Sequence, residues 1–176
     1  MTGVLVDDRT CEELTRLFNI FRIANLNVRY YGCRAARFDA RERFLQLATA
    51  GLSAGALALL LASGADWSRW AAAIMAGLAA SLAAVDPSLA WKDAAREMHV
   101  RREAYGHLFT LIESVITDIR RSGRITDEQY GASKTVHEAF ERLDAIDEAR
   151  PDNRLKDKVD QEVRKAFPPD YLWTNF

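Results

Sequence analysis

Residues 59–73 read LLLASGADWSRWAAA and place two charged residues and two tryptophans between long apolar segments. Asp66 and Arg69 are nearly alone in this part of the sequence. Of the 49 Asp, Glu, Lys and Arg residues, only these two and Asp86 lie between Phe44 and Trp91, and the other 46 are spread over the remaining 128 residues. So uneven a charge distribution indicates an apolar environment for the middle of the chain and an aqueous one on both sides.

The apolar segments on either side of this turn are long enough to cross a membrane as helices. Residues 44–65 contain no charged residue, and as a helix they would rise about 33 Å, which matches the hydrocarbon core of a bilayer. We therefore predict a transmembrane hairpin with spans at about 44–65 and 70–91 and an outer turn at 64–69. The alternative is a hairpin buried in a soluble protein, whose other helices would have to cover two helices that are apolar on every face.

Basic residues mark both borders of the predicted hairpin. Five arginines lie between positions 29 and 43, four basic residues follow Trp91, and the turn holds one Asp and one Arg. Since cytoplasmic segments are enriched in Lys and Arg, we expect both termini in the cytoplasm and the turn outside. The border residues are also candidates for contact with anionic lipid or a nucleotide: Arg34, Arg37, Arg41, Arg43, Lys92, Arg96, Arg101 and Arg102.

The segment before the hairpin has the pattern of one long helix. Thr10 and Glu13 have capping-box spacing and predict its start. Apolar residues then recur every three or four positions from Leu14 to Phe38, a heptad seam without proline. The helix is therefore expected to continue unbroken into the apolar segment. The seam consists of Leu14, Leu17, Phe21, Ala24, Val28, Tyr31, Ala35 and Phe38.

Three further helices are predicted after the hairpin. The first runs over residues 92–121 and is closed by Ser122 and Gly123; the second opens with a capping box at Thr126 and ends near Ala149; the third covers residues 152–167. The predicted fold class is an all-α membrane protein, with a two-helix transmembrane hairpin and long cytoplasmic helices packed as a coiled-coil-like bundle. The predicted divisions are 1–43, 44–91 and 92–176.

Small residues in both spans predict close helix packing, because helices in lipid associate through backbone approach over small side chains. Gly51 and Gly55 form a GxxxG pattern in the first span. The candidate packing residues of the second span are Ala72, Ala73, Ala76, Gly77, Ala80, Ser81 and Ala84. Whether they join the two spans or neighbouring subunits stays open. Candidate pore-lining residues are Ser53, Ser81 and Asp86; for Asp86 the alternative is a helix cap in the headgroup layer.

Motifs for catalysis or for cofactors are not evident. His99, Glu103 and His107 share one helix face, but no second set of ligands accompanies them, so we predict no metal site and no cofactor. The sequence has no glycine-rich phosphate loop and no nucleophile motif, and a non-enzymatic protein is expected. A formal net charge of -1 and a pI near 6.3 give no general attraction to nucleic acid, which we do not expect as a partner.

The order of these parts resembles the SLATT domain family, two-transmembrane effectors associated with the nucleotide-synthesising SMODS enzymes and nucleotide-sensing SLOG domains of bacterial conflict systems. Four stretches carry the resemblance: NVRYYGCRAARFDARERF, AWKDAAREMHVRREAYGHLFTLIESVITDIR, RITDEQY and DEARPDNRLKDKVDQEVRKAF. The resemblance implies an antiviral effector of the bacterial inner membrane that disrupts the membrane when a nucleotide or partner protein signals. The chain has no room for a fused sensor domain, so the signal would come from a separate sensor or nucleotide-synthesising enzyme, or would bind the cytoplasmic helices directly.

Two functions follow as expectations. The first is a homo-oligomeric membrane effector that assembles along its helix seams and opens a pore or leak. The second is a membrane-tethered helical scaffold that docks a partner protein without forming a pore. Membrane lipid is the expected partner in both.

Overall fold

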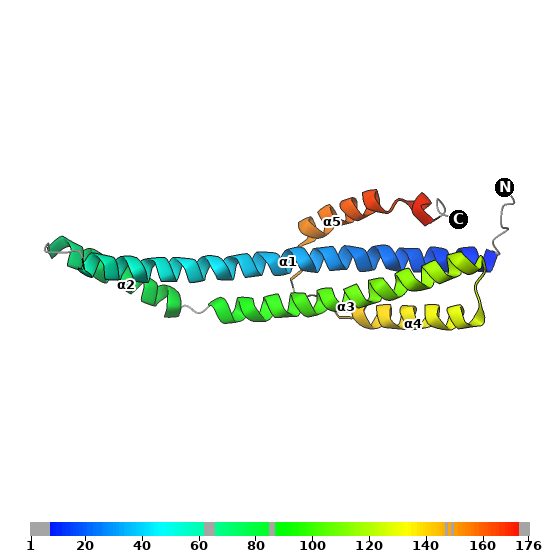
Figure 1. Ribbon diagram of the computed structural model, residues 1–176, viewed down its shortest axis with the longest axis horizontal. Coiled ribbons are helices and arrows are strands. Elements are labelled where there is room, and N and C mark those ends of the chain that lie inside the picture. The colour runs from blue at the N-terminus through cyan, green and yellow to red at the C-terminus, as the bar shows by residue number, and fades with distance from the viewer. Residues whose placement is uncertain (1–7, 62–65, 85–86, 147, 149, 173–176) are drawn as a thin grey trace. The chain divides into compact units, whose positions relative to one another are not determined.

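The computed structural model describes residues 8–61, 66–84, 87–146, 148 and 150–172 (Figure 1). The described part is all-helical, which confirms the predicted α class. Its elements are α1 (Asp8–Leu61), α2 (Asp66–Ala84), α3 (Pro87–Ser122), α4 (Asp127–Asp144), α5 (Asn153–Ala166) and the 3-10 helix η1 (Pro169–Leu172).

The chain divides into two compact units. Unit 1 comprises residues 1–32 and 99–176, and unit 2 comprises residues 33–98. The helices α1 and α3 contribute residues to both units. As predicted, α1 is one continuous helix that extends from the polar N-terminal segment into the apolar segment.

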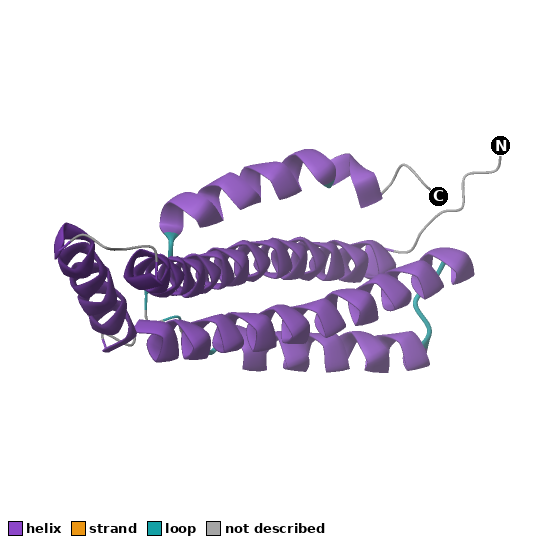
Figure 2. Cartoon of the chain, turned by 60° about the vertical axis from the view of Figure 1, so that its left-hand side comes forward, coloured by secondary structure: helices purple, strands orange, loops and turns teal. Residues whose placement is uncertain are grey.

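Unit 1 is a bundle built around the first part of α1. In two views α5 runs along the opposite side of α1 from α3, and α4 runs beside α3 (Figure 1, Figure 2). The predicted seam of α1 is mostly buried. Phe18, Ile20, Leu26 and Tyr30 are buried as well, because α1 has neighbours on more than one side. The buried α3 residues are Met98 (from unit 2), Tyr105, Leu108, Ile112, Val115, Ile116 and Ile119.

An aromatic cluster joins the C-terminal segment to this core. The ring of Phe21 lies 4.6 Å from Phe109 and 5.1 Å from Phe167, and Phe18 stacks on Tyr171 at 6.3 Å. Arg120 also donates a hydrogen bond to the carbonyl of Tyr171 at 3.2 Å. Phe167 and Tyr171, which follow α5, are therefore packed against α1 and α3.

The two predicted capping boxes have different outcomes. At Thr126 the box is present, because the Thr126 hydroxyl accepts from the Gln129 amide and the Gln129 side chain accepts from the Thr126 amide. The prediction at Thr10 is wrong: α1 begins by Asp8, and Thr10 lies inside the helix with 1% of its surface exposed. Its hydroxyl accepts a hydrogen bond from the Ile125 amide at 3.2 Å. The Thr10 hydroxyl, which the local pattern predicted as a helix cap, therefore takes part in a tertiary contact instead.

Of the three helices predicted after the hairpin, α3 and α5 end where expected and α4 does not. Gly123, with φ of 69°, follows the last turn of α3 in the left-handed conformation that glycine favours. The helix α4 ends at Asp144, so the predicted end near Ala149 is wrong. In the connector between α4 and α5, Glu148 accepts a hydrogen bond from Tyr30 on α1. Asp152 caps α5 by accepting from the Leu155 amide at 3.0 Å.

Unit 2 contains the rest of α1, all of α2 and the first turns of α3. The predicted second span, 70–91, is not one helix among the described residues, because α2 ends at Ala84 and α3 begins at Pro87. Proline lacks the backbone N–H that would continue α2 and is favourable at the first position of a new helix. Asp86 lies outside the described residues, as does part of the predicted turn.

Candidate functional site

Unit 2 exposes an extensive apolar surface. The side chains of α1 from Phe44 onward and of α2 point outward on several sides, and Leu61 is 87% exposed. A contiguous apolar surface of this kind is unusual for a protein surrounded by water and typical of one that contacts lipid or another protein. The exposed large residues are Phe44, Leu47, Leu57, Leu60, Leu61, Trp67, Trp70, Ile74, Leu78 and Leu82.

Among the described residues, α1 is the one helix long and apolar enough to cross a membrane. Only 6% of the residues in its most apolar window are buried within the protein, whereas the core helix of a soluble protein would be mostly covered. The helix α2 is shorter and carries Asp66 and Arg69 in its first turn; its residues 70–84 hold no charge.

The contact between α1 and α2 is made over small residues. A Cβ atom added at Gly55 would lie 2.5 Å from the Met75 Cε, so the end of the Met75 side chain of α2 lies against the backbone of α1 there. Ala56 on α1 and Ala72 and Ala79 on α2 are buried. Ala79 was not among the residues singled out from the sequence, although it lies one heptad after Ala72.

The remaining small residues of the predicted set lie on the exposed surface of unit 2. A Cβ atom at Gly51 or Gly77 would meet no atom within 4 Å. The hydroxyl of Ser81 donates to the Gly77 carbonyl at 2.8 Å, and Ser53 is exposed. The two glycines of the GxxxG pattern therefore differ, since only Gly55 lies at the helix contact. The other exposed members are Ala73, Ala76, Ala80 and Ala84.

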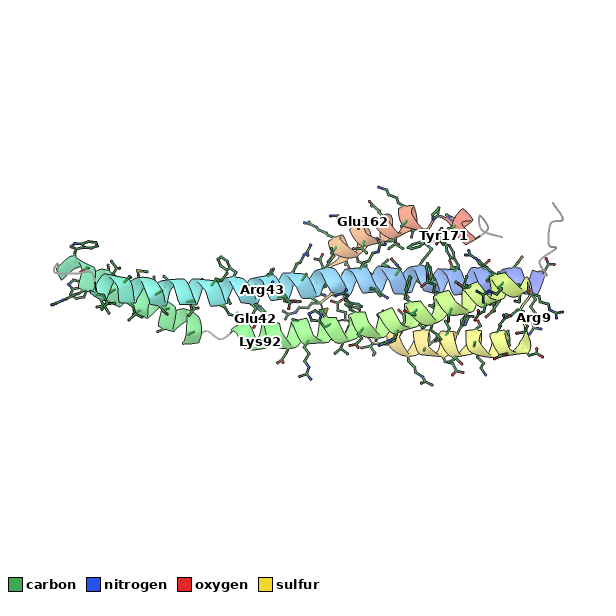
Figure 3. All side chains as sticks on the ribbon, viewed as in Figure 1. Arg9, Glu42, Arg43, Lys92, Glu162 and Tyr171 are labelled. Carbon is green, nitrogen blue, oxygen red and sulfur yellow. The ribbon has the colours of Figure 1, made fainter. Side chains whose placement is uncertain are left out.

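The basic residues at the hairpin border do not form one set. In unit 2, Lys92 on α3 pairs with Glu42 on α1 at 3.4 Å, next to the exposed Arg43 (Figure 3). Arg41 lies over the ring of Trp91 at 6.0 Å. Arg34 stands 5.7 Å from the Phe38 ring, and Arg37 and Arg96 are exposed.

Two members of the basic set belong to unit 1 and have structural partners there. The guanidinium of Arg101 donates to the Tyr31 hydroxyl at 3.4 Å and to the Ile146 carbonyl at 3.1 Å. The side chain of Arg102 covers the backbone at Gly32, where an added Cβ would lie 3.4 Å from its Nε. Their role in the fold could not be read from charge alone.

The histidine face of α3 is solvent-exposed. His107 Nε2 lies 3.8 Å from Glu103 Oε1, and both side chains are more than two-thirds exposed. No group of three or more His, Cys, Asp or Glu residues with metal-binding geometry occurs in the described part of the chain.

Unit 1 contains a buried polar cluster that the sequence did not predict. Glu13 is 8% exposed and accepts a hydrogen bond from the fully buried hydroxyl of Ser133. His137 Nδ1 lies 2.9 Å from the Ser133 carbonyl and 4.0 Å from Glu13 Oε1. The cluster joins α1 to α4, and because its members are 120 residues apart, no local pattern signals it.

Comparison with family models, with curated proteins and with solved structures finds no match to this chain. The SLATT resemblance thus remains a prediction from the sequence.

Proposed function

We propose that unit 2 is embedded in a membrane and that unit 1 is a helical bundle on the cytoplasmic side. The observation that carries this proposal is the exposed apolar surface of α1 and α2, which no described element of the chain covers. Lipid as the neighbour removes the cost of leaving these side chains in water.

The basic border supports the orientation. Arg41, Arg43, Lys92 and Arg96 all belong to unit 2 and lie where the apolar part of α1 begins and shortly after α3 begins. Anionic headgroups of the inner leaflet attract such residues. This arrangement favours a bacterial inner membrane with both termini in the cytoplasm.

We propose further that the protein is a SLATT-like effector that oligomerises and permeabilises this membrane. The exposed small residues of α2 support the step, because Gly77 and its neighbours leave space for close approach by another helix. Glycine in a helix costs about 1 kcal/mol relative to alanine. Packing within the chain does not explain why Gly77 is a glycine, because an added Cβ there would meet no atom within 4 Å.

Reconstitution tests both steps. The purified chain is added to vesicles of phosphatidylethanolamine and phosphatidylglycerol, and flotation and release of an entrapped dye are measured together. We expect flotation with the vesicles and dye release that Gly77→Leu abolishes. Gly131→Leu is the matched control, since an added Cβ at Gly131 in α4 also meets no atom within 4 Å. Flotation without dye release would favour the scaffold, and failure to float would refute the membrane proposal.

A further inference from the structure

A cleft in unit 1 lies where the connector between α4 and α5 passes α1. Its volume is about 470 Å³, and its lining comes from α1, α3, the end of α4, the connector and the start of α5. The polar groups that matter for its chemistry are Asn27, Tyr30, Tyr31, Tyr105, Asp144 and Glu148. None of them was singled out as a site from the sequence.

Asn27 is the first sign that the cleft takes a ligand. Its side chain lines the cleft, only 7% of the residue is exposed, and it forms no hydrogen bond with any residue that the structure describes. The Asn27 amide atoms are not among the polar atoms buried away from solvent, so from the cleft they can bond to water or to a ligand. The amide offers one acceptor oxygen and two N–H donors.

Carboxylates supply the second sign. Asp144 is exposed at the cleft and forms no ion pair with a described residue. Glu148, deeper in the connector, accepts the hydroxyl hydrogen of Tyr30 at 2.9 Å. The wall between α1 and the connector is therefore rich in acceptors, with Lys156 as the cation that lines the cleft.

The cleft region already accepts one guanidinium group from the protein itself. Arg101 lies 5.7 Å from the centre of the Tyr31 ring and donates to the Tyr31 hydroxyl and the Ile146 carbonyl. Charge-assisted hydrogen bonds and cation–π contact both favour this geometry. The same types of group, an aromatic hydroxyl, a carbonyl and a carboxylate, remain at the cleft for a second cation.

The electrostatic environment disfavours an anion. Burial is the main cause that raises the pKa of Tyr105 to about 12; the negative charges that Tyr31 and Asp144 can carry act in the same direction, and Arg101 opposes them. The phenol is therefore neutral at physiological pH and can donate a hydrogen bond. A phosphate group would face the carboxylates of Asp144 and Glu148.

We propose that this cleft binds an organic cation, a primary ammonium or guanidinium group on a short apolar stem. The cationic group would bond to the Asp144 carboxylate and the Asn27 carbonyl, and the stem would lie against the exposed side chains of Ile23 and Ile146. The cation can be a free amine such as a diamine, or the arginine side chain of a partner peptide. The proposal does not depend on membrane permeabilisation.

The test uses the full chain in detergent and isothermal titration calorimetry. The probes are 1,4-diaminobutane, ethylguanidinium and acetyl-Gly-Arg-Gly-amide, with inorganic phosphate and ATP as anionic comparisons. Asp144→Asn removes the exposed charge and Asn27→Leu removes the amide at similar volume. Glu162→Gln, at an exposed carboxylate of α5 that does not line the cleft, is the matched control (Figure 3).

We expect at least one cationic probe to bind, with affinity reduced about tenfold or more by Asp144→Asn and unchanged by Glu162→Gln. Binding of the free amines assigns the cleft to a small molecule, and binding of the peptide alone assigns it to a partner protein. Circular dichroism checks that each variant folds. If the Asn27→Leu variant does not fold, the Asp144→Asn variant alone tests the proposal. The proposal is overturned if no cation binds, if both variants bind as the unmodified chain does, or if the anions bind in its place.

Discussion

Tyr30 and Glu148 are 118 residues apart in the sequence and are joined by a hydrogen bond of 2.9 Å. The same Tyr30 hydroxyl accepts a hydrogen bond from the Asp152 amide, also at 2.9 Å. One nearly buried side chain of α1 thus holds the connector and the first residues before α5. The position of α5 in unit 1 depends on this group as well as on Leu155, Val159 and Val163.

Tyr30→Phe is expected to loosen the connector without changing the core. The substitution keeps the ring and removes the hydroxyl that donates to the Glu148 carboxylate and accepts from the Asp152 amide. We expect a loss of about 1–3 kcal/mol in the free energy of unfolding and faster hydrogen exchange over residues 150–166. Tyr130→Phe, at an exposed tyrosine of α4, should change neither quantity.

Ser133→Ala is expected to destabilise the contact between α1 and α4. The change removes the hydroxyl that bonds to the buried Glu13 carboxylate, so this charge loses a donor. We predict destabilisation by about 1–3 kcal/mol in chemical denaturation. Ser114→Ala is the control, because Ser114 is exposed and its hydroxyl donates only to the Leu111 carbonyl one turn earlier. Equal effects of the two substitutions would contradict the role given to the cluster.

Gly55→Leu and Gly51→Leu should separate the contact within unit 2 from contacts between copies. At Gly55 a larger side chain meets the flexible end of Met75, which has to move, so Gly55→Leu should weaken the contact between α1 and α2 and lower thermal stability more than Gly51→Leu does. At Gly51 a side chain meets no atom, so the thermal stability of the detergent-solubilised monomer should hold or rise. Loss of oligomers on crosslinking of the Gly51 variant would assign that surface to neighbouring subunits. A Gly51 variant as unstable as the Gly55 variant would refute the distinction.

Leu57→Arg tests the environment of the apolar surface. Leu57 is well exposed, so in water an arginine there would change stability little, whereas within a membrane it costs about 2.5–3.5 kcal/mol on insertion scales. We expect a smaller membrane-bound fraction in cell fractionation. Leu111→Arg, at an exposed leucine of α3 in unit 1, should leave that fraction unchanged. Equal fractionation of both variants would argue against lipid at Leu57.

Alkaline pH should weaken unit 1 through Tyr105. Its pKa is raised to about 12 in the folded protein, above the value of about 10 for an unfolded tyrosine. A raised pKa means that the neutral form is favoured by folding, so this contribution to stability is complete below pH 10 and is lost between about pH 10 and 12. We expect the free energy of unfolding to fall over this interval and to fall less in Tyr105→Phe. Tyrosinate absorbance is titrated in the unmodified chain and in Tyr105→Phe. The difference between the two curves should show Tyr105 ionising near pH 12 rather than near 10.

The sequence predicts which segments form helices, because helix formation depends on residues within a few turns of one another. The unbroken α1, the capping box at Thr126, the end of α3 at Gly123 and the extent of α5 all rest on spacings of three to five residues. The predicted hairpin rests on the absence of charged residues from 44–65. The structure adds one observation to that prediction, the exposure of the apolar side chains of α1 and α2.

Other features depend on which segments meet in space. Thr10 and Glu13 match a capping box by spacing, yet they face Ile125 and Ser133 in the folded chain. The connector leaves α4 early because Tyr30 binds Glu148, a contact that no local pattern contains.

The sequence by itself determined the helical periodicity, the break at Gly123 and the separation of charged from apolar segments, since these follow from backbone conformation and solvation of successive residues. Only the tertiary structure decided that Gly55 and not Gly51 contacts α2, that Arg101 is bound to Tyr31, and that Asn27 lines a cleft without a partner. Periodicity gives each residue a helix face, but packing between helices distant in sequence decides what that face meets.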